Sequence, residues 1–250
     1  MPFWHKLWLN VVAQKLRLEN QPAFVLHSYP YRETSLIVEV FSQNFGRLPL
    51  VARGARRPKS AVRGLLMAFQ PLQLNWFGKT ELRTLHSAEW QGGQPQLQGM
   101  ALMCGFYLNE LLLKLLQRDD PHEQLFLYYQ ETLQLLSASS DVAAILRRFE
   151  KRLLQELGYA LTLDREAETN APVMAGEDYC YVIERGPVRQ SAGQNGVELR
   201  GKTLLDLAAD DYSDPVTLQQ GKMLMRTLLN HYLGDQPLHT RQLLKDLQQI

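Results

Sequence analysis

The chain of 250 residues has the length of one or two compact globular units. Its composition, 45% apolar and 21% charged, allows a sizeable core and excludes an intrinsically disordered or collagen-like chain. No apolar run approaches the roughly 20 residues that a membrane-spanning helix needs. Residues 1–20 lack the cleavage site of a secretory signal. We therefore expect a cytoplasmic protein with a short N-terminal extension, either native or added by an upstream start codon.

The formal net charge of +1 conceals an uneven distribution along the chain. Residues 1–95 hold 12 Lys and Arg against 5 Asp and Glu, a balance of +7, whereas residues 96–250 hold 15 against 21, a balance of −6. The densest cationic segment contains no carboxylate and carries Arg47, Arg53, Arg56, Arg57, Lys59 and Arg63. Because such like charges repel one another unless an anion is near, the segment predicts a polyanion-binding site, with a solvated basic loop as the alternative.

Residues 23–88 alternate short apolar runs with turn residues, which is the pattern of antiparallel strands. The expected strands are Ala23–Ser28, Ser35–Ser42, Arg47–Arg53, Phe69–Phe77 and Glu81–Ser87. Turns at residues 44–46 and 77–79 favour hairpins, and the stretch between the third and fourth strands is expected to be irregular. Five short antiparallel strands are typical of a small barrel, of which the oligonucleotide-binding (OB) fold is the commonest five-stranded type.

Beyond residues 92–95 the apolar period changes from 2 to 3.6, which predicts a domain boundary and a helical C-terminal part. Helices are expected at 99–118, 121–138, 141–157, 203–209, 215–233 and 240–249. Asp141 is placed to cap the third helix and Gly158 to end it. A hairpin of 179–183 with 188–191 is expected within a polar stretch. The predicted fold class is α+β, with a five-stranded OB-fold β-barrel followed by an α-helical C-terminal domain.

The sequence offers little catalytic chemistry. Cys104 and Cys180 lie far apart, which predicts neither a disulfide framework nor a closed zinc site and suits a reducing compartment. The nucleophile-elbow, metalloprotease and dinucleotide-binding motifs do not occur, and the six histidines are scattered. We therefore expect no catalytic residues, no metal and no other cofactor.

Residues 196–203 match the G-x-x-x-x-G-K-[ST] string of a phosphate-binding P-loop letter for letter. A phosphate cradle needs a buried strand before the string and a long helix after it. Here the preceding residues are polar, Glu198 would place a carboxylate in the loop, and the following helix stops by Asp210. The favoured interpretation is a turn followed by a loop-to-helix entry, and ATP binding is the disfavoured alternative.

Aromatic residues accompany the basic segment in the expected barrel, as in proteins that bind single strands by phosphate neutralisation and base stacking. Phe41 is expected in the interior, whereas Phe45 and one of the pair Trp76 and Phe77 are better placed as exposed platforms. The predicted nucleic-acid-binding set comprises Arg47, Arg53, Arg56, Arg57, Lys59, Arg63, Phe45 and Trp76.

The expected helix 141–157 carries an apolar stripe on one face and cations on another. The cations are Arg148, Lys151 and Arg152, with Arg147 near the edge. A basic cluster next to apolar surface can hold a peptide that bears acidic residues and a terminal carboxylate. The alternative is a solvated helix flank whose cations pair with Glu150 and Glu156.

Several short segments resemble those of a known family. They are Ala23–Ser28, Glu33–Leu36, Gly46-Arg47, Val51–Arg56, Phe69–Leu72, Leu85–Glu89, Tyr107–Leu111, and Leu146–Glu150 with Leu157–Tyr159. Each segment is short, but their ordered recurrence over about residues 21–250 resembles the bacterial recombination mediator family RecO. This resemblance implies an OB-fold DNA-binding domain at 21–92, after the extension at 1–20. It also implies a helical domain at 97–250 with a small β-hairpin insert at about 159–200.

The resemblance further implies a non-enzymatic DNA repair protein, associated with the nucleoid. Such a protein would bind single- and double-stranded DNA, anneal complementary strands, and help RecR to load RecA onto DNA coated with single-strand DNA-binding protein. Carried onto matching positions, the DNA contact falls on the basic segment, and Arg147 falls at the pocket for the C-terminal tail of that coating protein. Many family members carry a four-cysteine zinc site after the third helix, but residues 164–189 contain only Cys180, so zinc is not expected.

A competing hypothesis comes from the basic face of the third helix alone. On this hypothesis the protein is an interaction adaptor that uses Arg148, Lys151 and Arg152 and does not bind DNA directly.

Overall fold

The computed structural model of the protein describes residues 17–159, 161–189 and 195–247. These residues form two compact units. The first comprises the described residues up to Ser137 together with those from Leu238 onward, and the second runs from Ala138 to Pro237. Most of the expected N-terminal extension, residues 1–16, lies outside the described residues, and the first strand already begins at Arg17.

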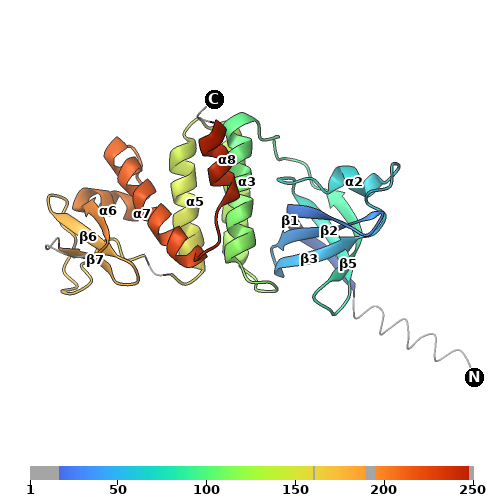
Figure 1. Cartoon of the computed structure of the whole chain (residues 1–250), viewed down its shortest axis with the longest axis horizontal. Helices are drawn as coiled ribbons and strands as arrows, with labels where there is room; N and C mark the ends of the chain where they lie inside the picture. The colour runs from blue at the N-terminus through green and yellow to red at the C-terminus, as the bar shows by residue number, and fades with distance from the viewer. Residues whose placement is uncertain (1–16, 160, 190–194, 248–250) are drawn as a thin grey trace, which may run out of the picture. The chain divides into compact units, whose positions relative to one another are not determined.

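A closed five-stranded barrel forms the N-terminal part of the first unit (Figure 1). Its strands are β1 (Arg17–Tyr31), β2 (Ser35–Ser42), β3 (Gly46–Ala52), β4 (Leu72–Phe77) and β5 (Arg83–Trp90). Their order around the barrel is β1-β2-β3-β5-β4, and every neighbouring pair is antiparallel except β3 with β5. This arrangement confirms the predicted OB-like barrel, with the ends of β1, β3, β4 and β5 shifted from the sequence expectation.

Alternation along the strands fills the barrel interior. Val38 and Val40 of β2 and Leu48 and Leu50 of β3 are fully buried in one apolar cluster, which also contains Trp76 of β4. Because successive side chains of a strand point to opposite faces, the intervening residues of β2 and β3 lie on the outer face of the barrel. The basic segment that follows β3 contains a short helix, α2 (Ala61–Leu65), where the sequence predicted only irregular chain.

Helices α3 (Gly99–Leu115), α4 (Glu123–Ala138) and α8 (His239–Leu247) complete the first unit. An aromatic cluster joins the barrel to them: the ring of Phe24 on β1 lies 5.4 Å from that of Phe126 and 5.2 Å from that of Tyr129 on α4. Asn109 of α3 accepts a hydrogen bond from the Tyr129 hydroxyl at 2.5 Å and donates one to the Leu26 carbonyl at 2.8 Å. Part of the outer face of β1 and β2 is therefore covered by helices.

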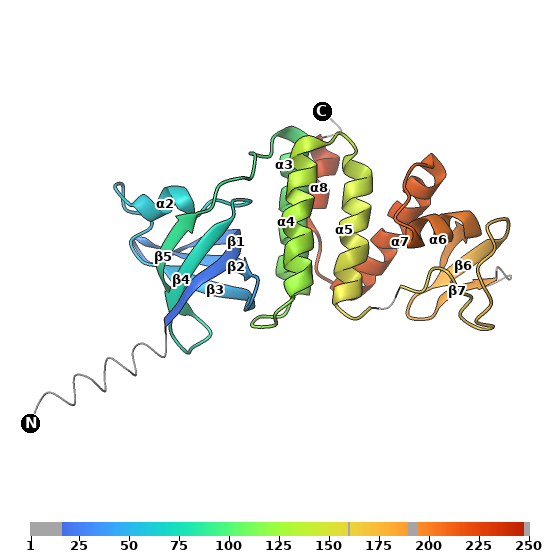
Figure 2. The same ribbon diagram turned by 180° about the vertical axis from the view of Figure 1, so that it is seen from behind.

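The second unit combines helices with a small sheet of strand order β7-β6-β8 (Figures 1 and 2). Its elements are α5 (Val142–Glu156), β6 (Asp178–Val182), β7 (Gly186–Arg189), β8 (Val197–Arg200), α6 (Gly201–Ala208) and α7 (Pro215–Leu233). The Asp141 carboxylate accepts a hydrogen bond from the Ala144 N–H at 3.3 Å, which confirms it as the N-cap of α5. Strand β8 was not predicted. No helix in the described part of the chain combines the length and the apolar character needed to cross a membrane.

Candidate nucleic-acid interface

The basic segment is held against the turn between β1 and β2 by Arg56. The backbone N–H of Arg56 donates to the Thr34 carbonyl at 2.9 Å, and its Nη1 donates to the Arg32 carbonyl at 3.3 Å. Strand β3 ends at Ala52, and Arg53 is the next residue. These contacts fix the start of the segment at the rim of the barrel, so its cations project from a defined position.

Five of the six predicted cations remain available at this rim. Arg53, Arg56, Arg57, Lys59 and Arg63 are all exposed. Within the described ranges, none of the five forms a salt bridge. An uncompensated group of cations gives the rim a positive potential that attracts polyanions. DNA binding by these five residues stays a prediction, and their exposed charge is the property that it requires.

Arg32 extends the basic rim, and the sequence analysis missed it. It is exposed, adopts a left-handed backbone conformation with φ of 51°, and places its guanidinium carbon 5.1 Å from the centre of the Tyr31 ring. Its carbonyl is the one that receives the Arg56 hydrogen bond. Residues 32 and 56 are far apart in sequence, so only the pairing of β1, β2 and β3 could have grouped them.

Arg47 has a different role from the other cations of its segment. Its Nη1 lies 3.1 Å from a carboxylate oxygen of Glu39, and its Nε donates to the Leu116 carbonyl at 3.1 Å. Arg118 pairs with the other Glu39 oxygen. Because Glu39 is only 4% exposed, its charge needs these partners. Arg47 therefore ties the barrel to the loop after α3, and we remove it from the proposed interface.

The expected aromatic platforms are mostly not exposed. Trp76 is fully buried in the barrel core, and Phe45 packs edge-on against it with ring centres 5.5 Å apart. The expectation that Trp76 offers an exposed ring is wrong, because the register of β4 turns it inward and leaves its neighbour Phe77 40% exposed. The sequence alternation alone left open which member of the pair faces the core.

The second predicted site, the basic face of α5, is largely occupied by internal partners. Arg147 Nη2 lies 2.5 Å from a Glu150 carboxylate oxygen. Arg152 Nη2 lies 3.1 Å from the Asp210 carboxylate, and Arg148 donates to the Asp210 backbone carbonyl at 3.2 Å. The alternative interpretation expected these cations to pair with Glu150 and Glu156 on a solvated helix flank. Glu150 does pair with Arg147, but its side chain is buried. Asp210, which follows α6, was not anticipated.

Lys151 is a structural residue of the second unit. It is 3% exposed, and its Nζ lies 2.6 Å from the Leu207 carbonyl and 2.5 Å from the Asp210 carboxylate. A cation at this position satisfies the last carbonyls of α6 and opposes the negative end of that helix. The expectation that Lys151 is available to a peptide is therefore wrong, whereas Arg148 is exposed and Arg152 half-buried.

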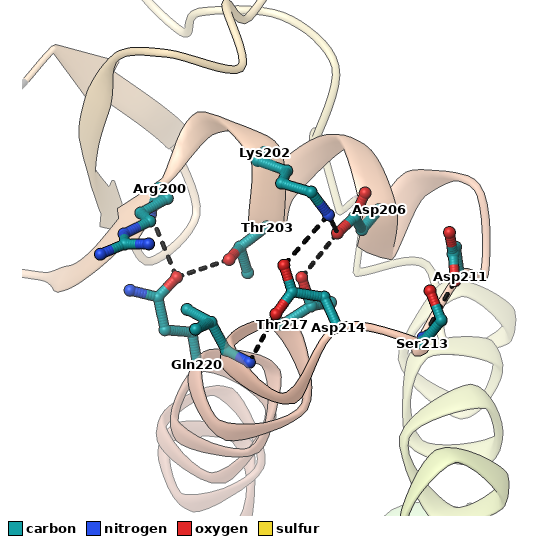
Figure 3. A network of polar contacts seen from close by, with 10 residues as sticks. Arg200, Lys202, Thr203, Asp206, Asp211, Ser213, Asp214, Thr217 and Gln220 are labelled. Atoms are coloured by element: carbon teal, nitrogen blue, oxygen red, sulfur yellow. Dashed lines mark hydrogen bonds and ion pairs between the residues drawn. The ribbon is translucent and has the colours of Figure 1, made fainter.

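The P-loop string folds as strand and helix rather than as a phosphate cradle (Figure 3). Residues 197–200 form β8, and the backbone N–H groups of Gly201 and Lys202 donate to the carbonyls of Glu177 and Ala175. Lys202 Nζ is held 2.5 Å from Asp206 and 3.2 Å from Asp214, and Thr203 donates to Gln220 at 2.5 Å. The donors that a P-loop offers to phosphate are thus already used, which supports the interpretation given above.

The polar stretch after α5 is organised by one buried carboxylate. Glu166 is 5% exposed and accepts hydrogen bonds from Arg189 Nε at 2.8 Å and from the Thr169 hydroxyl at 2.5 Å. The bond from Arg189, followed by the one from Thr169, lowers the pKa of Glu166. Among the described residues, no group of three or more His, Cys, Asp or Glu side chains is arranged to hold a metal ion.

The fold and the exposed cations define an OB-barrel protein with a helical C-terminal part. Comparison with known proteins makes the assignment specific. Family models described as the N-terminal and C-terminal parts of recombination protein O match residues 16–93 and 96–242. The chain therefore belongs to the RecO family of DNA repair proteins.

Three relatives illustrate the extent of the similarity, and each is called DNA repair protein RecO. The protein of Nitrosospira multiformis is 65% identical over 240 residues, covering 95% of this chain and 99% of the relative. Those of Aromatoleum aromaticum and Dechloromonas aromatica are 55% identical over 240 residues and 58% identical over 238 residues. These two alignments cover 96% and 94% of this chain, and 100% and 98% of the relatives.

Proposed function

We propose that this protein is a non-enzymatic recombination mediator that binds single- and double-stranded DNA through the basic rim of its barrel. It anneals complementary strands and helps RecR to load RecA onto DNA coated with single-strand DNA-binding protein. The observation that carries the proposal is the group of exposed cations at residues 53–63, which form no salt bridge within the part of the chain that the structure describes, joined by Arg32. Membership of the RecO family supports it.

Charge neutralisation supplies the mechanism of annealing. Two complementary strands repel each other through their phosphates, and cations that bind both strands lower that repulsion. Annealing by this mechanism involves no chemical step. It requires only guanidinium and ammonium groups that can exchange their counterions for phosphates. Phosphate contacts carry no base sequence, so the same rim serves any pair of complementary strands.

The C-terminal tail of single-strand DNA-binding protein is the proposed ligand of the α5 region. Arg148 and Arg152 are the groups best placed to receive an anionic peptide, because Lys151 is buried against α6. An incoming carboxylate has to replace Asp210 as the partner of these arginines, and Arg147 has to exchange Glu150 for the tail. Exchange of one ion pair for another favours specificity over raw affinity.

The salt dependence of DNA binding tests the proposal. Four or five phosphate contacts on single strands give a slope of log K against log salt of about −3 to −3.5, from roughly −0.7 per contact. Charge reversal in the double variant Arg56→Glu, Arg57→Glu should abolish most of the binding. A flat salt dependence, or a charge-reversed variant that binds as well as wild type, contradicts DNA binding at the rim and favours the adaptor hypothesis.

A further inference from the structure

A β-bulge in β1 changes the face of the barrel on which the side chains that follow it lie. Before the bulge, Ala23 and Val25 belong to the barrel core. The register against β2 then shifts between Val25 and His27. Without the shift, strict alternation would also send residues 27, 29 and 31 inward. A bulge re-aims the side chains that follow it.

The re-aimed side chains all carry rings. His27, Tyr29 and Tyr31 lie opposite Glu39, Ile37 and Ser35 of β2, which alternate with the core residues Val38 and Val40. The three rings therefore belong to the outer face of the barrel. His27 and Tyr29 are exposed, Tyr29 to 45%, and their ring centres lie 4.4 Å apart at an interplanar angle of 63°.

This row of rings runs directly into the basic rim. Tyr31 ends β1 and lies under the Arg32 guanidinium, and the Arg32 carbonyl binds Arg56. At the other end of the row, the Glu39 carboxylate opposite His27 is buried and paired with two arginines, so it does not confront an approaching phosphate. The row is therefore a strip of rings that joins a cationic rim, exposed at His27 and Tyr29 and half-buried at Tyr31 among the described residues.

We propose that Tyr29, flanked by His27 and Tyr31, is a base-stacking strip that gives the barrel a preference for unpaired DNA over duplex. This inference rests on the proposed DNA binding. It adds that the rings contact the bases of the DNA, whereas the rim contacts its phosphates. Cations at the rim bind phosphates of either form, whereas an exposed ring face stacks only on a base that has left its duplex.

The geometry of the rings leaves one stacking face rather than a row of slots. The His27 and Tyr29 ring centres are 4.4 Å apart and tilted, so no base fits between these two rings. Bases in one strand of a duplex lie about 3.4 Å apart and cover one another's faces. An unpaired base has a free face, so it can stack on the exposed ring of Tyr29 where a duplex cannot.

The test measures the affinity of Tyr29→Ala for an oligodeoxythymidine and for a hairpin duplex by fluorescence anisotropy. Loss of one stacked base, roughly 1–3 kcal/mol, raises Kd for the single strand about 5- to 140-fold. Kd for the duplex should stay within about twofold of the wild-type value. Tyr29→Phe should keep wild-type affinity because the ring remains. Phe106→Ala is the matched control, since Phe106 is a similarly exposed ring on helix α3, outside the barrel, and its loss should leave both affinities unchanged.

The outcomes separate this inference from the function on which it rests. Wild-type protein that binds neither DNA overturns both. Wild-type protein that binds with the expected salt slope, while Tyr29→Ala behaves like wild type or weakens both DNAs equally, overturns only the stacking strip. Photocrosslinking of wild-type protein to an oligonucleotide that contains 5-iododeoxyuridine gives a readout without mutation. Crosslinks should map to the peptide that contains Tyr29, and crosslinks confined to other peptides contradict the proposal.

Discussion

Glu110 on α3 caps the N-terminus of α8 through Thr240. One Glu110 oxygen accepts hydrogen bonds from the backbone N–H of Thr240 at 2.9 Å and from its hydroxyl at 2.6 Å, and the other accepts from the His239 N–H at 2.8 Å. Lys114 Nζ lies 2.9 Å from the same carboxylate. Burial by itself would raise the pKa of Glu110, but the hydrogen bonds from Thr240, Lys114 and His239 outweigh burial and lower the pKa to about 2.

We expect Glu110→Gln to destabilise the first unit by about 1–2 kcal/mol at neutral pH, the range of a lost helix N-cap. Because the pKa of the folded state is depressed, the charged carboxylate stabilises the fold fully above pH 4.5 and progressively less as the pH falls toward 2. The difference in unfolding free energy between wild type and Glu110→Gln should therefore shrink over that window. Urea unfolding at a series of pH values measures it.

Glu131→Gln is the control for this experiment, because Glu131 is an exposed carboxylate on the neighbouring helix α4. It should change neither the stability at pH 7 nor its acid dependence. A Glu110→Gln difference that stays constant from pH 7 to pH 2 would show that the carboxylate charge does not contribute to the capping of α8.

Lys151→Met should destabilise the second unit strongly. The substitution leaves two α6 carbonyls without their buried donor and removes one of the cations that neutralise Asp210. Breaking a buried ion pair by removing one partner costs about 3–5 kcal/mol. Arg148→Ala, on the exposed part of the same helix, should cost less than about 1 kcal/mol. Thermal unfolding followed by circular dichroism compares the two, and equal losses would argue against a structural role for Lys151.

The sequence predicted the fold well where local signals were strong. The bounds of β2 and α7 agree with the expectation, because a clear alternation marks β2 and the Asp214-Pro215 start and Gly234 mark α7. Strand β8 was missed because Val197–Arg200 is short, and its pairing with β6 is a tertiary contact that no local pattern shows.

The sequence predicted where the cations of the candidate site lie, but not which of them form ion pairs inside the protein. The run of cations after β3 is visible in the sequence, and five of its six members are exposed. Arg47 meets a buried carboxylate because it lies opposite Phe41 on the outer face, beside the loop that follows α3. The outward rings of β1 were equally hidden, because a bulge between Val25 and His27 breaks the alternation that sequence analysis assumes.

Chelation should leave the second unit intact. The polar stretch after α5 is held together by Glu166 with Arg189 and Thr169. Treatment with EDTA should therefore not change the Tm, whereas Glu166→Gln should lower it at neutral pH. The pKa of Glu166 is depressed, so its stabilising effect is present above the ordinary glutamate pKa and is lost on further acidification. A Tm that falls with EDTA would show that a metal contributes to this region.

Arg47→Ala and Arg57→Ala should have opposite signatures, although the two arginines lie in one basic segment. Arg47 pairs with the buried Glu39, so its loss should lower the unfolding free energy by about 1–3 kcal/mol. This cost is smaller than that of an unpaired buried charge, because Arg118 still pairs with Glu39. Loss of Arg47 should leave the salt slope of DNA binding unchanged. Arg57 is exposed and without a salt bridge in the described ranges, so its loss should spare stability and reduce the slope by about 0.7. Urea unfolding and salt titration of both variants measure the contrast, and a reduced slope in Arg47→Ala would return that residue to the DNA interface.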